Sequence, residues 1–180
     1  PVYANPAFLR TNMKIYVVYS DDDGKTWETT DFLDVLPFHA PCVGGGGPMR
    51  EAPNGDIILP LAGHLEEGIS YGWILCSGYI YSKDGGETWG KPVVVARGED
   101  DRGQWYGEIA VLPRKDEPWV AMARMNPLFR TQESGHGCLG GYRCLSYDQG
   151  QTWTLPEPIS HTVAYPVLHE LRDGGILFAG

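Results

Sequence analysis

The chain has 180 residues and carries 23 acidic against 14 basic side chains, for a formal charge of −9. This balance argues against wholesale nucleic-acid binding, although it is compatible with a locally basic pocket for an anionic ligand. No apolar run approaches the ~20 residues of a membrane-spanning helix. The 24 glycines, 14 prolines and 42% hydrophobic residues are typical of a globular all-β protein with tight turns.

An octapeptide of the pattern Ser-x-Asp-x-Gly-x-Thr-Trp occurs three times, at residues 20–27, 82–89 and 146–153. The copies begin at Ser20, Ser82 and Ser146, so the two intervals between them are nearly equal. A regular repeat with a turn and an aromatic in each copy predicts a modular β-array whose usual unit is a propeller blade. The spaced acids suggest calcium, but the ligand pattern of an EF-hand loop is missing.

A structural role for the octapeptide is the favoured interpretation. We expect its Asp and Ser side chains to accept hydrogen bonds from backbone N–H groups in a tight turn. The Gly supplies a positive φ, and the Trp is expected to pack into the blade.

Short strands are predicted on both sides of the octapeptides. Alternating apolar residues precede the three copies at 15–19, 73–81 and 141–145. Proline-containing strands follow two of the copies, at 91–95 and 155–159. Because proline is tolerated on edge strands, these two are expected to be the outermost strands of their blades.

Three hairpins are predicted between and after the octapeptides, and Asn54-Gly55 is a strong two-residue turn signal for the first of them. The hairpins join 48–53 to 56–62, join 107–113 to 118–124 through a polar turn, and begin at Tyr165 with a turn at 173–175.

These elements predict a single partial β-propeller domain over residues 1–180, with about three blades. Two four-stranded blades span 46–98 and 105–160, an outer half-blade spans 14–38 and an inner half-blade spans 163–180. Propellers need roughly four to eight blades to close. We therefore expect either a fragment of a longer chain or two copies that complete a ring, since an open half-propeller leaves unpaired edges.

The octapeptide is the Asp box, and the chain resembles the sialidase (neuraminidase) superfamily of BNR or Asp-box β-propellers over nearly its whole length. The resemblance implies an all-β fold of the six-bladed sialidase type. It does not by itself imply an enzyme, because the motif also occurs in propellers with other roles.

Glu108 and Arg124 form the candidate functional pair. They are equally far along the chain from residue 116, which lies in the predicted turn. Residues equidistant from a hairpin turn face one another, so we expect cross-strand neighbours at the end away from the turn. An ordinary cross-strand ion pair is the simpler interpretation. The preceding blade has no such pair around Pro48 and Gly63.

The segment from Trp105 to Leu112, followed by Arg124, looks like the sialidase motif in which a Glu on an inner strand is followed by an Arg at this same separation. The resemblance implies that Arg124 grips a substrate carboxylate and that Glu108 polarises a Tyr nucleophile, with a separate Asp as general acid/base. Guanidinium forks bind carboxylates bidentately. A neutral Tyr approaches an anionic sugar more easily than a carboxylate does.

Tyr165 lies eight residues before Asp173, as Glu108 lies eight before Asp116. It is therefore expected at the same inner-strand position one blade later, as a candidate nucleophile or a channel-lining residue. In the family, the Tyr lies two blades after the Glu. Further candidates for substrate binding are Trp105, Tyr106 and Arg50.

The activity implied by the resemblance is that of an exo-α-sialidase-like glycoside hydrolase acting on a glycan or glycoconjugate. The alternative is a non-catalytic carbohydrate- or protein-binding propeller. The family's first Arg and its general acid have no counterpart before the first octapeptide, so a complete active site is not expected in this chain.

No cofactor and no metal are expected, because the five histidines lack metal-ligand spacing. The other predicted partners are the missing blades or a second copy, and no nucleic acid. Cys138 and Cys144 either bridge across a hairpin or remain free buried thiols.

Overall fold

The computed structural model describes residues 14–43, 47–65, 75–98, 104–127 and 140–180. Regular structure in these ranges consists of β-strands. No helix in the described ranges has the length and apolar character needed to cross a membrane. The strands are β1 (Val18–Tyr19), β2 (Glu28–Thr29), β3 (His39–Cys42), β4 (Arg50–Glu51), β5 (Ile57–His64), β6 (Leu75–Ser82), β7 (Val93–Arg97), β8 (Gln104–Leu112), β9 (Trp119–Pro127), β10 (Gly140–Ser146), β11 (Glu157–Thr162), β12 (Val167–Glu170) and β13 (Ile176–Ala179).

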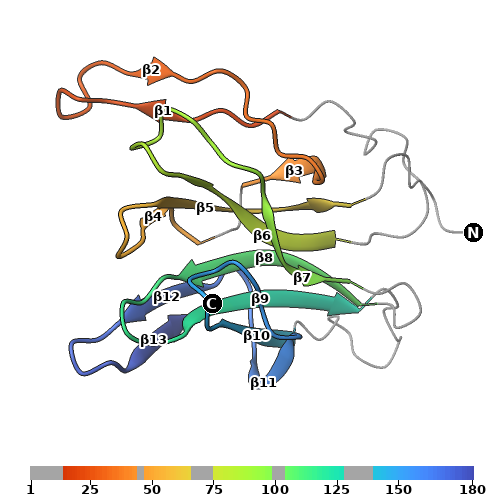
Figure 1. Ribbon diagram of the computed structural model, residues 1–180. Coiled ribbons are helices and arrows are strands. Elements are labelled where there is room, and N and C mark those ends of the chain that lie inside the picture. Colours follow the sequence, from red (N-terminus) through yellow and green to blue (C-terminus); the bar gives the residue numbers. More distant parts are fainter. Residues whose placement is uncertain (1–13, 44–46, 66–74, 99–103, 128–139) are drawn as a thin grey trace, which may run out of the picture.

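The strands form four sheets, within which all the paired strands are antiparallel. Two are two-stranded, β1–β2 and β12–β13. The sheet β8–β11 has the order β8-β9-β10-β11, and the sheet β3–β7 has the order β3-β5-β6-β7 with β4 also paired to β5. The sheets follow one another in chain order through the molecule, from β1–β2 to β12–β13 (Figure 1). The all-β prediction is therefore confirmed.

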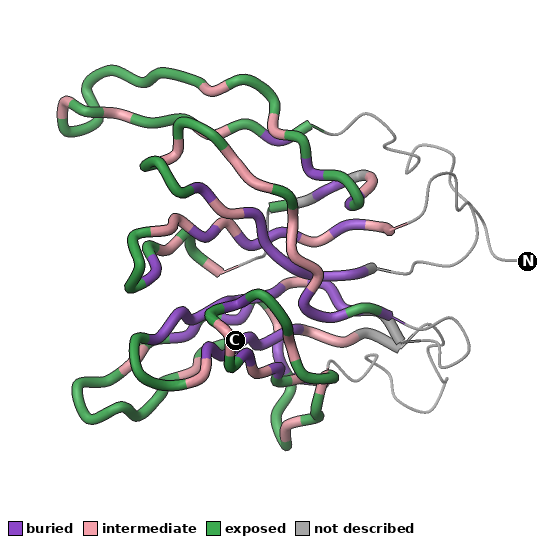
Figure 2. The backbone as a smooth tube through the Cα atoms, in the orientation of Figure 1, coloured by how far each residue is buried: buried purple, intermediate pink, exposed green. Residues whose placement is uncertain are grey.

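The sheet β8–β11 is buried on both faces. Along β8, Ile109 and Val111 belong to a core shared with the sheet β3–β7, whereas Ala110 and Leu112 belong to a core shared with β12–β13. Successive side chains of a strand point to opposite faces, so one strand can serve two cores. Burial is accordingly concentrated where sheets adjoin, and it falls off towards β1–β2 (Figure 2).

The predicted edge strands β7 and β11 each lie at the end of their strand order, as expected. A proline also occurs inside a central strand, at Pro60 of β5, opposite Tyr79. On the other side of β5, Ile58 pairs with β4 and Ala62 pairs with β3, so Pro60 lies between two separate partners. The break between β3 and β4 therefore coincides with a residue that lacks a backbone donor.

The hairpin turns are closed by backbone hydrogen bonds. In the β4–β5 turn, Ala52 N donates to Asp56 O (2.7 Å) and Gly55 adopts a φ of 88°. In the β12–β13 turn, Leu171 N donates to Gly175 O (2.7 Å). Together with the pairing of β8 and β9, these turns confirm the three predicted hairpins, except that the last one begins at Val167 and not at Tyr165.

Each octapeptide has the same internal hydrogen bonds. The Ser hydroxyl donates to the Asp Oδ1 and accepts from the Gly N–H, at 2.8 Å in all three copies. The Asp carboxylate also accepts from the backbone N–H and the hydroxyl of the Thr. The Gly has a φ of 79°, 102° or 87°. The turn role expected for these residues is confirmed.

These bonds lower the pKa of all three octapeptide carboxyls to about 2. The largest cause at Asp22 is the backbone N–H of Thr26, and at Asp84 and Asp148 it is the hydroxyl of the Thr four residues later. Hydrogen bonds to the charged form favour that form, which is why each carboxyl ionises at unusually low pH.

The octapeptide tryptophans differ in their burial. Trp89 and Trp153 pack against buried cores, whereas Trp27 is 61% exposed. The packing prediction is confirmed for the first two and wrong for Trp27. The reason is positional, because no described sheet lies before β1–β2 in the stack to cover the Trp27 ring.

Candidate functional site

Glu108 and Arg124 face one another across the β8–β9 hairpin. Glu108 Oε2 lies 2.5 Å from Arg124 Nε, and the two side chains are 13% and 18% exposed. Tyr106 pairs with Met125 and Ile109 pairs with Ala123. The two residues of β8 between them, 107 and 108, therefore lie opposite a single residue of β9, Arg124. This bulge is a departure from the symmetric hairpin that the spacing assumed, and bulges commonly re-aim a side chain. The predicted contact itself is confirmed.

The pair lies on a hairpin whose edge strand meets neighbouring sheets. Gly47, just before β4, donates its N–H to Ile109 O (2.7 Å). A Cβ at Gly47 would lie 2.7 Å from the Ala110 Cβ, so this close approach requires glycine. The Arg50 guanidinium of β4 donates to the carbonyl oxygen of Leu168 in β12. The edges of three sheets therefore converge around β8.

Two aromatic candidates for substrate binding, Trp105 and Tyr106, lie on β8. Tyr106 is 4% exposed, and its ring packs edge-to-face against Tyr142 at 5.3 Å between centroids. Trp105 lies opposite Asn126 in the strand register, and its side chain is outside the described residues. Stacking of either ring on a sugar stays a prediction.

Tyr165 does not occupy an inner strand. It lies in a bend before β12, with a φ of 52° and 63% exposure. The strand begins after Pro166, because a residue without a backbone N–H cannot donate to the ladder. Within the described part of the chain, no hydrogen bond joins Tyr165 to Glu108. The predicted strand position of Tyr165 is wrong, and its role stays a prediction.

The family model of the BNR repeat-like domain matches residues 3–179. The chain belongs to this family. A sialidase of Paraclostridium sordellii is 26% identical over 164 residues, which cover 87% of this chain and 36% of the relative. The predicted membership of the sialidase-like BNR superfamily is confirmed, and the chain spans about a third of that relative's length.

A solved structure adds information on the fold of this BNR chain. The crystal structure of a protein of unknown function from Dyadobacter fermentans superposes with a TM-score of 0.67 at 22% identity. The match covers 91% of this chain and 43% of that one. At this identity the likeness supports the shared fold alone.

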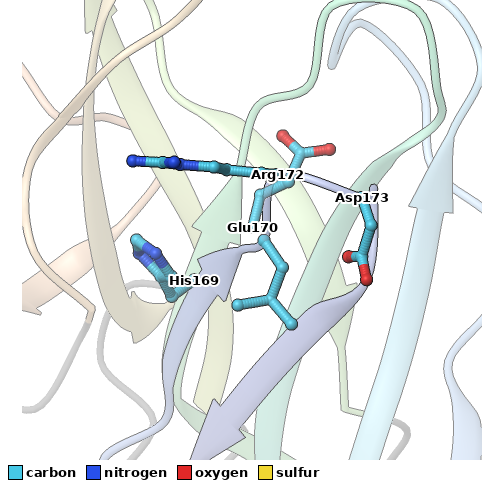
Figure 3. A pocket seen from close by; sticks show the side chains of 5 residues that line it. His169, Glu170, Arg172 and Asp173 are labelled. Atoms are coloured by element: carbon cyan, nitrogen blue, oxygen red, sulfur yellow. The ribbon is translucent and has the colours of Figure 1, made fainter.

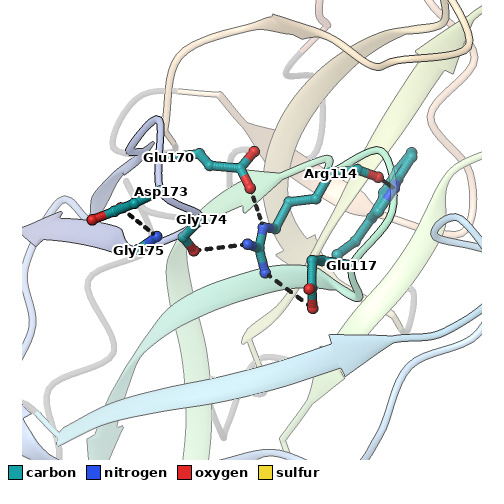
Figure 4. Close-up of polar contacts among 7 residues, drawn as sticks. Arg114, Glu117, Glu170, Asp173, Gly174 and Gly175 are labelled. Carbon is teal, nitrogen blue, oxygen red and sulfur yellow. Dashed lines mark hydrogen bonds and ion pairs between the residues drawn. The ribbon is translucent and has the colours of Figure 1, made fainter.

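Arg114, at the turn of the β8–β9 hairpin, is a residue that sequence reasoning missed. Its side chain is 8% exposed, and its Nε donates to Glu170 Oε1 at 2.7 Å. Its Nη2 donates to Gly174 O at 2.9 Å, and Glu117 lies 4.0 Å from Nη1 (Figure 4). The partner Glu170 is 56 residues away in the BNR chain, so no local spacing signals the contact.

A shallow hollow of about 460 Å³ lies beside the β12–β13 turn (Figure 3). Its Glu170 is bound to Arg114, and its Asp173 accepts from the N–H of Gly175. Arg114 is six residues along the chain from Glu108, which is roughly 20 Å along a strand. The hollow is therefore remote from the candidate pair. It is lined by His169, Glu170, Leu171, Arg172 and Asp173.

The cysteines offer no site in this part of the chain. Cys76 and Cys144 are both buried, and burial raises the pKa of the Cys144 thiol to about 12. Cys138 lies outside the described residues. No group of three His, Cys, Asp or Glu side chains suited to a metal ion occurs among the residues that were described.

Proposed function

We propose that this BNR chain carries part of the site of an exo-α-sialidase-like glycoside hydrolase acting on glycoconjugates. In this proposal Arg124 binds a sugar carboxylate and Glu108 acts beside it as the polarising base. The observation that carries the proposal is the ion pair of 2.5 Å between two mostly buried side chains on one hairpin. Family membership and the 26% identity to a sialidase support it.

The chemistry of the pair suits an anionic sugar. A guanidinium has five N–H donors in a planar fork, so contact of Nε with Glu108 can coexist with a carboxylate bound at the Nη atoms. The Glu108 carboxylate lies beside that fork. At 18% exposure, Arg124 keeps contact with solvent while its charge is less screened than on an open surface.

The same proposal includes a six-bladed propeller, with blades at 46–98 and 105–160 and half-blades at 14–38 and 163–180. The face-to-face succession of sheets supports this architecture, as does the convergence of the β4, β8 and β12 edges. In such a ring these edge strands line the central channel. Arg50 would then add positive charge near the channel.

A second function, glycan binding without cleavage, is favoured by the position of Tyr165. A Glu that polarises a Tyr must lie within hydrogen-bond reach of its hydroxyl, about 2.6–3.2 Å. Tyr165 lies in the bend before β12 and makes no hydrogen bond to Glu108 within the described residues. Catalysis would therefore need a nucleophile from another segment, whereas binding would not.

The carboxylate role of Arg124 can be measured by titrating the protein with free N-acetylneuraminic acid and, separately, with galactose. Loss of a bidentate charge-assisted interaction costs about 1.5–3 kcal/mol, so Arg124→Ala should weaken acid binding by roughly 10- to 100-fold. Arg124→Lys should recover only part of the affinity because it lacks the fork. Galactose binding should change little.

Arg143→Ala is the matched control, because Arg143 forms an exposed ion pair with Glu157 on the same sheet. It should bind N-acetylneuraminic acid as the wild type does. Unchanged affinity in a folded Arg124→Ala variant would sink the carboxylate assignment. Hydrolysis of a fluorogenic α-sialoside by the full-length protein then separates the two functions. Turnover that falls in Glu108→Gln without a change in affinity supports the hydrolase, and binding without turnover supports the alternative.

A further inference from the structure

Tyr165 has a backbone conformation that residues with large side chains rarely adopt. Its φ is 52°, and it precedes Pro166, a position where the backbone is normally extended with a negative φ. Among the described residues, Asp23 and Gln149 also have a positive φ without being glycine, and both occupy the fourth position of an octapeptide. Gly85 fills that position in the remaining copy with a φ of 76°, so the octapeptide turn itself requires the conformation. Tyr165 lies outside the octapeptides, so its strain has a different cause.

The chain just before Tyr165 lies against the strand that pairs with Arg124. Gly141 of β10 is opposite Arg124 in the register of β9 and β10. A Cβ at Gly141 would overlap the side chain of Val163, which is 1% exposed. Cross-strand partners point their side chains to the same face of a sheet, so Val163 lies on the face of Arg124. Tyr165 follows two residues later.

The chain that enters β12 lies beside β8. A Cβ at Gly47 would be 2.7 Å from the Ala110 Cβ and 3.5 Å from the Pro166 carbonyl oxygen, so Pro166 and Ala110 are near neighbours. Four residues further along both segments, Arg114 Nε donates to Glu170 Oε1 at 2.7 Å. The two segments therefore run side by side in the same direction.

The candidate pair lies on the face of the sheet β8–β11 that this segment covers. Met122 of β9 belongs to the core that the sheet shares with Leu168 of β12. Arg124 follows Met122 by two residues, and side chains two apart on a strand point to the same face. Arg124 therefore faces β12, and its partner Glu108 lies two residues before Ala110 on β8.

We infer that Tyr165 is a specificity-determining residue that contacts the body of the sugar held at the Glu108–Arg124 pair. The segment 163–166 is anchored at both ends and crosses the sheet beside this pair. A strained residue persists only where the surrounding structure holds it, and such residues cluster at ligand-binding positions. The inference rests on the proposed function, and it adds which part of the chain recognises the sugar ring.

The chemistry of a tyrosine complements that of the charged pair. Its ring offers an apolar face to the C–H groups of a sugar, and its hydroxyl can donate or accept a hydrogen bond. A carboxylate bound at Arg124 would therefore be joined by a contact to the ring that carries it. This combination selects an acidic sugar over small carboxylates, which have no ring for Tyr165 to contact.

Replacing Tyr165 by residues that favour its conformation separates strain from recognition. Gly and Asn adopt a positive φ more readily than Tyr, so Tyr165→Gly and Tyr165→Asn in the full-length protein should not lower the thermal midpoint of unfolding. Both should weaken the binding of N-acetylneuraminic acid by roughly 3- to 10-fold, because the ring contact is lost. Tyr165→Phe keeps the ring and should bind with close to the wild-type affinity.

Two controls accompany these variants. Tyr147→Asn removes another exposed tyrosine, which lies in the octapeptide next to the β8–β9 turn, and it should leave the affinity unchanged. Acetate carries the carboxylate without a sugar ring, so its competition for the site should be equal in the wild type and in the Tyr165 variants.

Wild-type affinity in both Tyr165→Gly and Tyr165→Asn overturns the inference, and it leaves the proposed function standing if Arg124→Ala still weakens binding. A lower thermal midpoint in both variants also overturns it, because Tyr165 is then a structural residue. Weaker competition by acetate in the variants does the same, since Tyr165 then acts through Arg124. A full-length wild type that does not bind N-acetylneuraminic acid contradicts the proposed function itself, and this inference with it.

Discussion

At the turn end of the β8–β9 hairpin, Arg114 binds Glu170 across two sheets, whereas at the other end Arg124 binds Glu108 within one hairpin. Both contacts are short, at 2.7 Å and 2.5 Å. The first arginine also donates to a backbone carbonyl, and it is the more buried of the two, at 8% against 18% exposure. The same residue types therefore serve two different purposes on one hairpin.

The difference extends to the surroundings of each end. The octapeptide turn of the same sheet begins at Ser146, opposite Trp119, so it lies at the turn end with Arg114. Trp119 Nε1 also donates to the backbone carbonyl of Arg114 (3.1 Å). The turn end is thus held by side-chain hydrogen bonds to backbone carbonyls. The Glu108–Arg124 pair in the bulge is the candidate for ligand binding. We therefore assign a stabilising role to the turn end of the hairpin and the proposed function to the end with Glu108 and Arg124.

The largest expected effect is on stability, from Arg114→Ala. The substitution leaves Glu170 and the Gly174 carbonyl without their donor, and we expect a loss of about 2–4 kcal/mol in the free energy of unfolding. Arg124→Ala removes a contact within one hairpin and should cost less, about 1–2 kcal/mol. Urea denaturation of both variants measures the difference. Equal losses would remove the distinction between the two ends.

Sequence reasoning recovered the contact that depends on local symmetry and missed the one that does not. Glu108 and Arg124 are equidistant from a turn, so hairpin geometry alone predicts that they meet. Arg114 and Glu170 meet because two sheets pack face to face, which no spacing along the chain encodes. Tyr165 was misplaced because Pro166 delays the start of β12, and Trp27 because its cover depends on a neighbouring sheet.

Acid should weaken all three octapeptide turns, of which the one at 146–153 lies at the turn end of the β8–β9 hairpin. Their carboxyls have a folded pKa of about 2, below the unfolded value near 3.9. Their contribution is therefore fully present above about pH 4 and is lost as the pH falls towards 2. Substituting Asn for Asp22, Asp84 and Asp148 together should lower the thermal midpoint at pH 6 and flatten its acid dependence. A parallel decline in the variant and the wild type would assign the acid effect to other groups.

The smallest effect is expected from the third Arg–Glu pair, Arg143 with Glu157. Its Nη2–Oε2 distance of 2.6 Å is as short as that of the other two pairs, but its side chains are 46% and 61% exposed. Water and salt screen such a pair, and ordering two long side chains costs entropy, so Arg143→Ala should change the unfolding free energy by less than about 0.5 kcal/mol. Urea denaturation in low and in moderate salt measures this. A loss comparable to that of Arg124→Ala would mean that distance, and not burial, ranks these pairs.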